Sequence, residues 1–248
     1  NFTFARNKIK FMNEVDYGNE YRQKTGRRLG EHFVYVVDHF VYDQAEADKL
    51  NAMNDGRGFQ PWGELHPGDV VYKDLNQDGK IDDYGDRTHM GFPRTPEIQF
   101  GIPFGIQYKG FDISVMFQGS LNSSILLNDQ YGKVKHMHLN RWTEATKDVA
   151  TYPRLTYGAY ENNKNGNSSL FLYNANYIRL KNLEVGYSLP KNIIRFAGLQ
   201  NVRFYVQGLN LLTFDSLDDV DMDPETKEGS GDWYPIQRVY NFGVETTY

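Results

Sequence analysis

The sequence predicts an all-β protein built from antiparallel strands of the membrane-spanning type, and three observations lead to this fold class. Apolar and polar residues alternate with a period of two over several segments of about ten residues. The connections between these segments are short and long in turn. Tyrosine, phenylalanine and tryptophan make up 15% of the 248 residues, and aromatic rings are typical of membrane–water interfaces.

The alternation is clearest from Ile98 to Tyr108 and from Tyr240 to Tyr248, where the even-numbered residues are mostly apolar. A further alternating run begins after only Lys109 and Gly110, so the two runs predict a hairpin with a two-residue turn. Strands are expected at 98–108, 111–118, 178–180, 183–189, 202–206 and 240–248, with weaker candidates at 2–12 and 33–42. The apolar phase changes by one residue between the third and fourth of these strands, which indicates a β-bulge.

Two segments need separate comment. Pro103 argues against the strand at 98–108, because proline removes a ladder hydrogen bond and is tolerated only at a bulge or a rim. Residues 43–54 are rich in Ala, Glu, Asp, Lys and Leu, so a helix is expected there.

The lengths of the connections predict how the strands cross a membrane. Long connections are expected at about 43–96, 120–175 and 214–237, and outer-membrane barrels place long loops outside and short turns in the periplasm. If Tyr248 ends in the periplasm, every long connection falls outside. An aromatic girdle then lies near the periplasmic rim, formed by Tyr108, Phe111, Tyr187, Phe204 and Tyr248. A soluble antiparallel sheet also alternates and remains an alternative.

The same alternation assigns a lipid-facing apolar set and a lumen-facing polar set. The lumen-facing residues would be Gln99, Gln107, Asp112, Ser114, Gln118, Asn182, Glu184, Arg203, Gln207 and Glu245.

Composition excludes several classes of protein. A net charge of -5 without a lysine-rich run argues against nucleic acid as a partner. The chain has no stretch of 18 consecutive apolar residues, so a membrane-spanning helix is not expected. The absence of cysteine removes disulfides and thiolate sites. No nucleophile elbow, P-loop or zinc-protease motif is present, so an enzyme is not expected. The first residue is Asn1, and a processed chain or a fragment is expected.

A candidate calcium site lies in the acidic segment 74–86, which begins like an EF-hand loop. Its expected ligands are Asp74, Asn76, Asp78, the carbonyl of Lys80, Asp82 and Asp86. The twelfth position, which needs a bidentate carboxylate, is Gly85, and Asp86 comes one residue late. The alternative is a cluster of Asx-turns in a polar loop.

Aromatic and histidine residues in the long connections are further candidates. Trp62, Trp142 and Trp233 could stack on substrate sugar rings or fill loop cores, and the sequence leaves both possibilities open. His136 and His138 could begin a zinc or copper site, but a surface pair is the commoner arrangement.

Several stretches resemble the C-terminal region of SusC/RagA-type TonB-dependent outer-membrane transporters. The stretches are 68–82, 108–119, 177–190 and 204–213, supported by 141–143, 152–155 and 235–243. The resemblance implies a 22-stranded barrel plugged by an N-terminal domain and located in the cell outer membrane. Such a barrel imports oligosaccharides or peptides with energy relayed through TonB, under a SusD-like surface lipoprotein. This chain would form about a quarter of such a protein, without the plug.

Two other functions remain open. A soluble calcium-dependent glycan-binding domain of the β-sandwich type would bury the apolar rows between two sheets. A glycoside hydrolase built on paired carboxylates ranks last, because the paired acidic residues lie in polar loops.

Overall fold

The computed structural model is dominated by one antiparallel sheet. It describes residues 1–14, 18–127, 138–157, 161–164, 166–195, 198–217, 222–226, 234 and 236–248. The large sheet has six strands in the order β1-β6-β7-β10-β11-β12. Three small sheets have two strands each and consist of β2 with β5, β3 with β4, and β8 with β9. The prediction of a mostly β, antiparallel fold is confirmed.

The strands of the large sheet are β1 (Phe2–Phe4), β6 (Ile98–Tyr108), β7 (Phe111–Leu121), β10 (Tyr177–Ser188), β11 (Asn201–Asp215) and β12 (Val239–Thr247). The small sheets contain β2 (His32–Tyr35), β3 (Val37–Phe40), β4 (Val70–Tyr72), β5 (Arg87–Met90), β8 (Ser124–Leu126) and β9 (Leu172–Asn174). The helices are α1 (Gln44–Asn51), α2 (Met53–Gly56), α4 (Glu161–Lys164) and α5 (Lys191–Ile194), with 3-10 turns η1 (Glu20–Arg22) and η2 (Ser169–Phe171). Among the described residues, no helix combines the length and apolar character needed to cross a bilayer.

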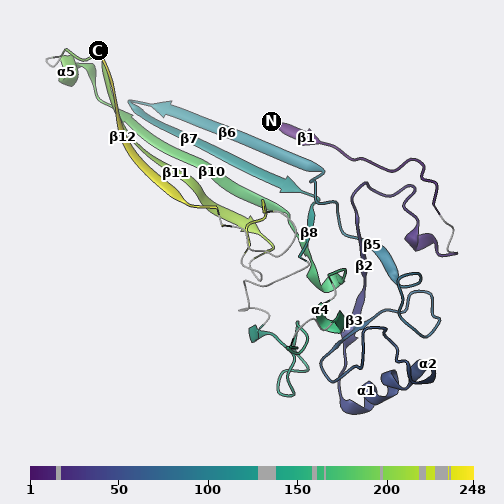
Figure 1. Ribbon diagram of the computed structural model, residues 1–248. Helices are drawn as coiled ribbons and strands as arrows, with labels where there is room; N and C mark the ends of the chain where they lie inside the picture. Colours follow the sequence, from purple (N-terminus) through teal and green to yellow (C-terminus); the bar gives the residue numbers. More distant parts are fainter. Residues whose placement is uncertain are drawn as a thin grey trace.

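The large sheet has two different ends. The turn at Lys109 and Gly110, helix α5 and the C-terminus lie at one end, here called the turn end (Figure 1). The connections that follow β7 and β11 and precede β6 leave the other end, here called the loop end. Short and long connections therefore lie at opposite ends of the sheet, as the topology of an outer-membrane wall requires.

Pro103 does not interrupt β6, so the sequence argument against this strand was wrong. The backbone N–H of Gly101 donates to the carbonyl of Asn1 on the β1 side of the strand. Because N–H groups two residues apart point to the same side, the nitrogen of Pro103 also faces the β1 side, away from β7. Among the described residues β1 pairs with Ile98 to Phe100. The nitrogen of Pro103 lies beyond that pairing and removes no hydrogen bond to β7.

The β-bulge is confirmed in β10. The register with both neighbouring strands shifts between Leu180 and Asn182. The shift keeps Leu180 and Leu183 on one face of the sheet, although their sequence positions have opposite parity.

The large sheet has an apolar face that no other layer of the described structure covers. Even-numbered residues of β6, β11 and β12 share this face with odd-numbered residues of β7, and Phe104 and Phe242 are 60% and 78% exposed. A β-sandwich would bury these rows between two sheets. The structure therefore contradicts the glycan-binding sandwich as an architecture.

Two of the three hydrophobic core clusters of the described residues lie in what we call the loop unit, residues 32–92 and 138–174 as far as they are described. One cluster contains Tyr35, Val70, Tyr72 and Ile81, and an adjacent one contains Val41, Ala47, Leu65 and Val71. The helix expected at 43–54 is present as α1, where the side chain of Asp43 accepts a hydrogen bond from the Glu46 N–H at 2.9 Å.

Two weaker strand predictions are only partly right. The strand expected at 2–12 ends at Phe4, and the one expected at 33–42 is divided into β2 and β3. The division reflects tertiary pairing, because β2 pairs with β5 whereas β3 pairs with β4.

Candidate functional site

The polar face of the large sheet gathers all ten residues that the sequence assigns to a lumen. The registers align Gln107 with Asp112, Ser114 with Glu184, and Glu184 with Gln207. Because directly paired residues of neighbouring strands share a face, these side chains form one continuous polar surface. The grouping predicted from alternation is confirmed.

Arg203 organises the polar face near the turn end. Its guanidinium donates to Asp112 Oδ1 at 3.0 Å, Glu184 Oε1 at 2.6 Å and Glu245 Oε2 at 3.3 Å. These carboxylates come from β7, β10 and β12, so one arginine on β11 links four adjacent strands. Since three carboxylates surround one guanidinium, the cluster carries a net negative charge.

Gly186 makes room for this cluster. A Cβ atom at Gly186 would lie 2.6 Å from both Arg203 Nε and Asp112 Oδ1. Any side chain at this position would therefore push Arg203 away from its partners. Alternation alone could not reveal this requirement, because Gly186 occupies an ordinary polar-face position in the sequence.

A second charged cluster lies at the loop end, around the buried side chain of Arg179. Its guanidinium binds Asp223 Oδ2 at 2.5 Å and Glu225 Oε2 at 2.7 Å, and Nε donates to Thr213 Oγ1 at 2.9 Å. Tyr177 also donates to Glu225, at 2.6 Å. The described residues 222–226 of the long connection after β11 are thus held over the polar face.

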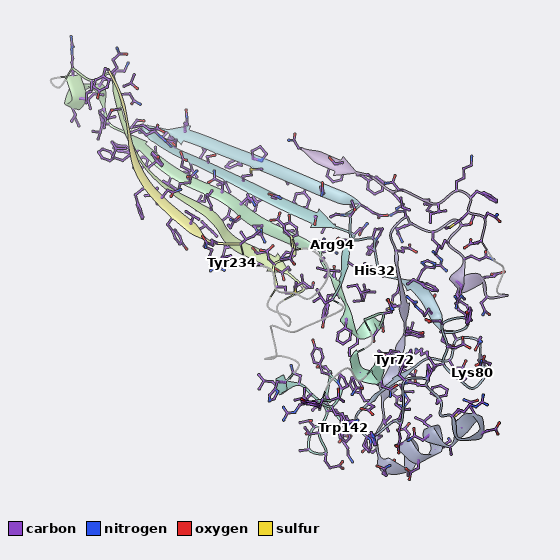
Figure 2. The ribbon with its side chains drawn as sticks, in the orientation of Figure 1. His32, Tyr72, Lys80, Arg94, Trp142 and Tyr234 are labelled. Atoms are coloured by element: carbon purple, nitrogen blue, oxygen red, sulfur yellow. The ribbon has the colours of Figure 1, made fainter. Side chains whose placement is uncertain are left out.

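A hollow of about 460 Å³ lies beside the Arg179 cluster, at the edge of the sheet. Its polar lining includes Arg94, Gln99, Gln118, Ser120 and Glu225. Figure 2 shows Arg94 at the junction between the large sheet and the loop unit. The hollow therefore lies at the loop end of the polar face.

The acidic segment 74–86 folds as a compact turn stabilised by its own carboxylates. Asp74 accepts from the Gly79 N–H at 2.7 Å, and Asp82 accepts from the Gly85 N–H at 2.7 Å. The carboxylate of Asp86 is buried and accepts from the N–H groups of Leu75 and Asp82, both at 2.8 Å. Asp86 therefore holds the two ends of the segment together, although it comes one residue after the position at which the EF-hand pattern expects a carboxylate.

The remaining candidate ligands are more open to solvent. Asn76 donates to Asp78 at 3.1 Å, and the Lys80 ammonium lies 3.0 Å from Asp82 Oδ2. Over the described part of the chain, no group of three or more His, Asp or Glu side chains is arranged around a common cation position. The geometry is that of successive Asx-turns, and calcium binding by this segment stays a prediction.

The two described tryptophans lie in loop cores. Trp62 packs edge-on against Tyr35 and Tyr72, with ring centroids 5.0 and 5.5 Å apart. Trp142, which is labelled in Figure 2, is 8% exposed. Its ring lies so close to Gly68 that a Cβ there would be 2.5 Å from it. Of the two possibilities left open by the sequence, the structure favours the loop-core role for both. Trp233 and His136 lie outside the described residues.

A buried polar network joins the two long connections before and after the hairpin β6–β7. Asp69, which is fully buried, binds Arg154 Nε at 2.5 Å and accepts from Asn163 Nδ2 at 2.8 Å. Gln60 donates to Asn162 at 2.8 Å. These pairs connect residues about 85 to 102 positions apart, so no local pattern in the sequence could have revealed them.

No family model matches the chain. TonB-dependent receptor P3 of Formosa agariphila is 35% identical over 164 residues, which cover 61% of this chain and 15% of that receptor. TonB-dependent receptor P26 of the same organism is 25% identical over 201 residues, covering 73% of this chain and 20% of that receptor. The chain thus spans about a fifth or less of the length of these relatives.

Solved structures agree with the sequence comparison at the level of fold. The structure of the RagAB peptide transporter matches with a TM-score of 0.63 at 22% identity, over 90% of this chain and 23% of the other. The 'closed-closed' state of the RagAB peptide importer matches with a TM-score of 0.58, over 90% of this chain and 23% of the other. These relatives are named as receptors and transporters, which fits the expectation of a protein that is not an enzyme. The chain is similar in sequence to TonB-dependent receptors, and it shares the fold of the matching part of the RagAB transporter.

Proposed function

We propose that the chain forms part of the wall of an outer-membrane importer driven through TonB. The observation that carries the proposal is the two-faced sheet: an uncovered apolar face lies opposite a continuous polar face, in a homologue of TonB-dependent receptors. Lipid is the solvent that makes an exposed apolar wall favourable, and a polar lumen is what such a wall encloses. The turn end faces the periplasm and the loop end faces outward.

The cargo in this proposal is an oligosaccharide or a peptide, and it passes along the polar face. The similarity in fold to the RagAB peptide transporter supports a peptide as one of these two cargoes. A SusD-like surface lipoprotein is the partner on the outer side, where the loop unit offers exposed apolar side chains such as Leu139, Leu155 and Tyr157. TonB acts through parts of the protein outside this chain.

Uptake measurements test the proposal. The full receptor that contains this chain would be deleted, and uptake of labelled oligosaccharides and peptides would be followed with and without an uncoupler of the proton-motive force. We expect one cargo class to lose uptake on deletion, and the same class to lose it on uncoupling. Undiminished uptake of both classes after deletion would contradict the proposal.

A further inference from the structure

The first 31 residues carry a charge opposite to that of the rest of the chain. They contain seven Lys or Arg and four Asp or Glu, an excess of three positive charges, whereas the whole chain carries -5. The remaining residues therefore carry -8. Such an asymmetry points to an anionic partner for this segment.

The fold concentrates this positive charge. Residues 7–9 pair with residues 27–29 in antiparallel fashion, through the Ile9 N–H to Arg27 O at 2.9 Å and the Leu29 N–H to Asn7 O at 3.0 Å. Lys8 lies directly opposite Arg28. Because the flanking residues make the hydrogen bonds, Lys8 and Arg28 form a non-hydrogen-bonded pair, whose side chains lie closest together. Like charges in this position are destabilising unless an anion compensates them.

Acidic residues compensate only part of this charge. Arg6 and Arg28 share the carboxylate of Glu97 at 2.8 and 2.7 Å, and Arg28 also binds Glu31 at 3.2 Å. Lys8 forms no ion pair with any described residue. The Arg27 guanidinium donates to the backbone carbonyls of Gln23 and Tyr21 at 3.2 and 3.3 Å. Of the four cations Arg6, Lys8, Arg27 and Arg28, Lys8 and Arg27 are therefore the two that no carboxylate of the described residues pairs with.

These cations border a hollow of about 420 Å³. Its charged lining consists of Arg6, Lys8, Arg27 and Arg28 together with Glu20 and Glu31, and Gln23 and Thr25 add neutral hydrogen-bonding groups. With Glu97, which binds Arg6 and Arg28, four cations meet three carboxylates, and the remaining positive charge and the neutral donors beside it match a phosphate group in charge and hydrogen bonding.

The hollow lies just beyond the loop end of the apolar face. Phe2 and Phe4 in β1 pair with Phe100 and Ile98 on that face and are 69% and 55% exposed. The chain then leaves the sheet at the loop end (Figure 1), and Arg6 and Lys8 follow at the next alternate positions. An apolar row that continues into a basic cluster is the arrangement expected where acyl chains give way to charged headgroups.

We propose that this hollow binds the phosphate of a lipid headgroup in the outer leaflet, with Lys8 and Arg27 as the cations that it neutralises. The inference rests on the proposed function, because it requires the apolar face to contact lipid. It adds a lipid-binding site to the outer rim of the wall, separate from the polar face along which cargo moves.

Native mass spectrometry of the full receptor in detergent tests the site. The probes are lipid A that carries its phosphates, lipid A from which the phosphates have been removed, and inorganic phosphate. The variants are Lys8→Gln, Arg27→Gln and the double variant, with Lys49→Gln combined with Arg57→Gln as a matched control on exposed cations of the loop unit. Arg27→Lys keeps the charge and separates charge from hydrogen bonding to the backbone.

We expect each single neutralisation to weaken binding of phosphorylated lipid A about five-fold and the double variant about 25-fold. The matched control and Arg27→Lys should bind like the parent, and lipid A without phosphate should bind all variants equally weakly. Equal binding of both lipids by the parent would overturn the inference. So would competition by inorganic phosphate as strong as that of the phosphorylated lipid. If the receptor inserts into bilayers but does not prefer phosphorylated lipid A, only this site is refuted. If the receptor does not insert, the proposed function is refuted.

Discussion

The large sheet and the loop unit place aromatic side chains in opposite environments, exposed in the sheet and buried in the loop unit. In the sheet, Phe104 and Phe242 are exposed, and no second layer of described residues covers them. In the loop unit, Tyr72 is 1% exposed and packs against Tyr35 and Trp62. An exposed apolar face is favourable in hydrocarbon, as the proposed function requires of the sheet, whereas the loop unit buries its apolar side chains in a core of its own.

The two regions also use charge differently. In the sheet, Arg203 links carboxylates from neighbouring strands across an open polar face. In the loop unit, Asp69 is buried against Arg154 and joins connections far apart in the sequence. Removal of one member should therefore be more damaging in the loop unit, where the remaining charge is left without water.

The largest effect is expected from removing the core of the loop unit. Tyr72→Ala deletes a buried ring that contacts two other aromatic side chains, at a cost of about 3 to 5 kcal/mol. Hydrogen exchange should show loss of protection in β3 and β4 while β6, β7 and β10 stay protected. Tyr157→Ala is the control, since that ring is fully exposed. Equal loss of protection in the sheet would mean that the two regions are not separate units.

A charge on the apolar face should have the next largest effect. Val115→Arg places a guanidinium among lipid chains near the middle of β7 and should cost about 2 to 4 kcal/mol in a bilayer. The neighbouring Ser114→Arg lies on the polar face opposite Glu184 and should be nearly neutral. Folding yields of both variants in lipid vesicles compare the two faces directly. Equally good folding of both would show that the apolar face does not contact lipid.

The structure changes the choice of control for that experiment. Alternation alone suggests that arginine at Asp112 or Glu245 is mild, because both residues are on the polar face. Both carboxylates bind Arg203, so a second guanidinium there would be repelled by the first. Ser114 lacks this conflict.

Calcium binding by residues 74–86 should have a smaller effect. If the segment binds calcium with the weak affinity of extracellular modules, millimolar calcium should stabilise the loop unit by about 1 to 2 kcal/mol. Isothermal titration should detect binding to the parent and to Asp148→Ala, but not to Asp78→Ala. Identical titrations for the parent and Asp78→Ala would leave the Asx-turn interpretation.

Acid should weaken the junction between the N-terminal segment and the sheet. The hydrogen bond from Arg6, aided by Asn122 and Arg28, lowers the pKa of Glu97 to about 2. A depressed carboxyl pKa contributes stability above the ordinary value near 4.5, and that contribution is lost as the pH falls towards 2. The effect should be the smallest of the four, because the side chain of Arg6 is partly open to screening by water.

Protection of residues 5–9 from hydrogen exchange should fall between about pH 4.5 and pH 2 in the parent. Glu97→Gln should show low protection with little pH dependence over the same range. A parent whose protection does not change over that range would contradict this account of Glu97.

Particular residues show how far the sequence could be used to predict the fold and the site. The strands at 98–108 and 111–118, the bulge after Leu180 and the grouping of polar residues all follow from a period of two, which needs no knowledge of distant contacts. The resemblance to TonB-dependent transporters also came from the sequence alone. The early end of β1 and the division at Val36 could not be predicted, because the pairing partner of each strand decides them.

The sequence by itself determined which side of each long strand is apolar, because alternation along a pleated strand fixes the direction of every side chain. Only the tertiary structure decided what the polar and aromatic residues of the connections do. Asp69 meets Arg154, Trp142 covers Gly68, and Lys8 faces Arg28 only after distant segments have come together. Local periodicity carries no information about such contacts, since they depend on how the connections pack against one another.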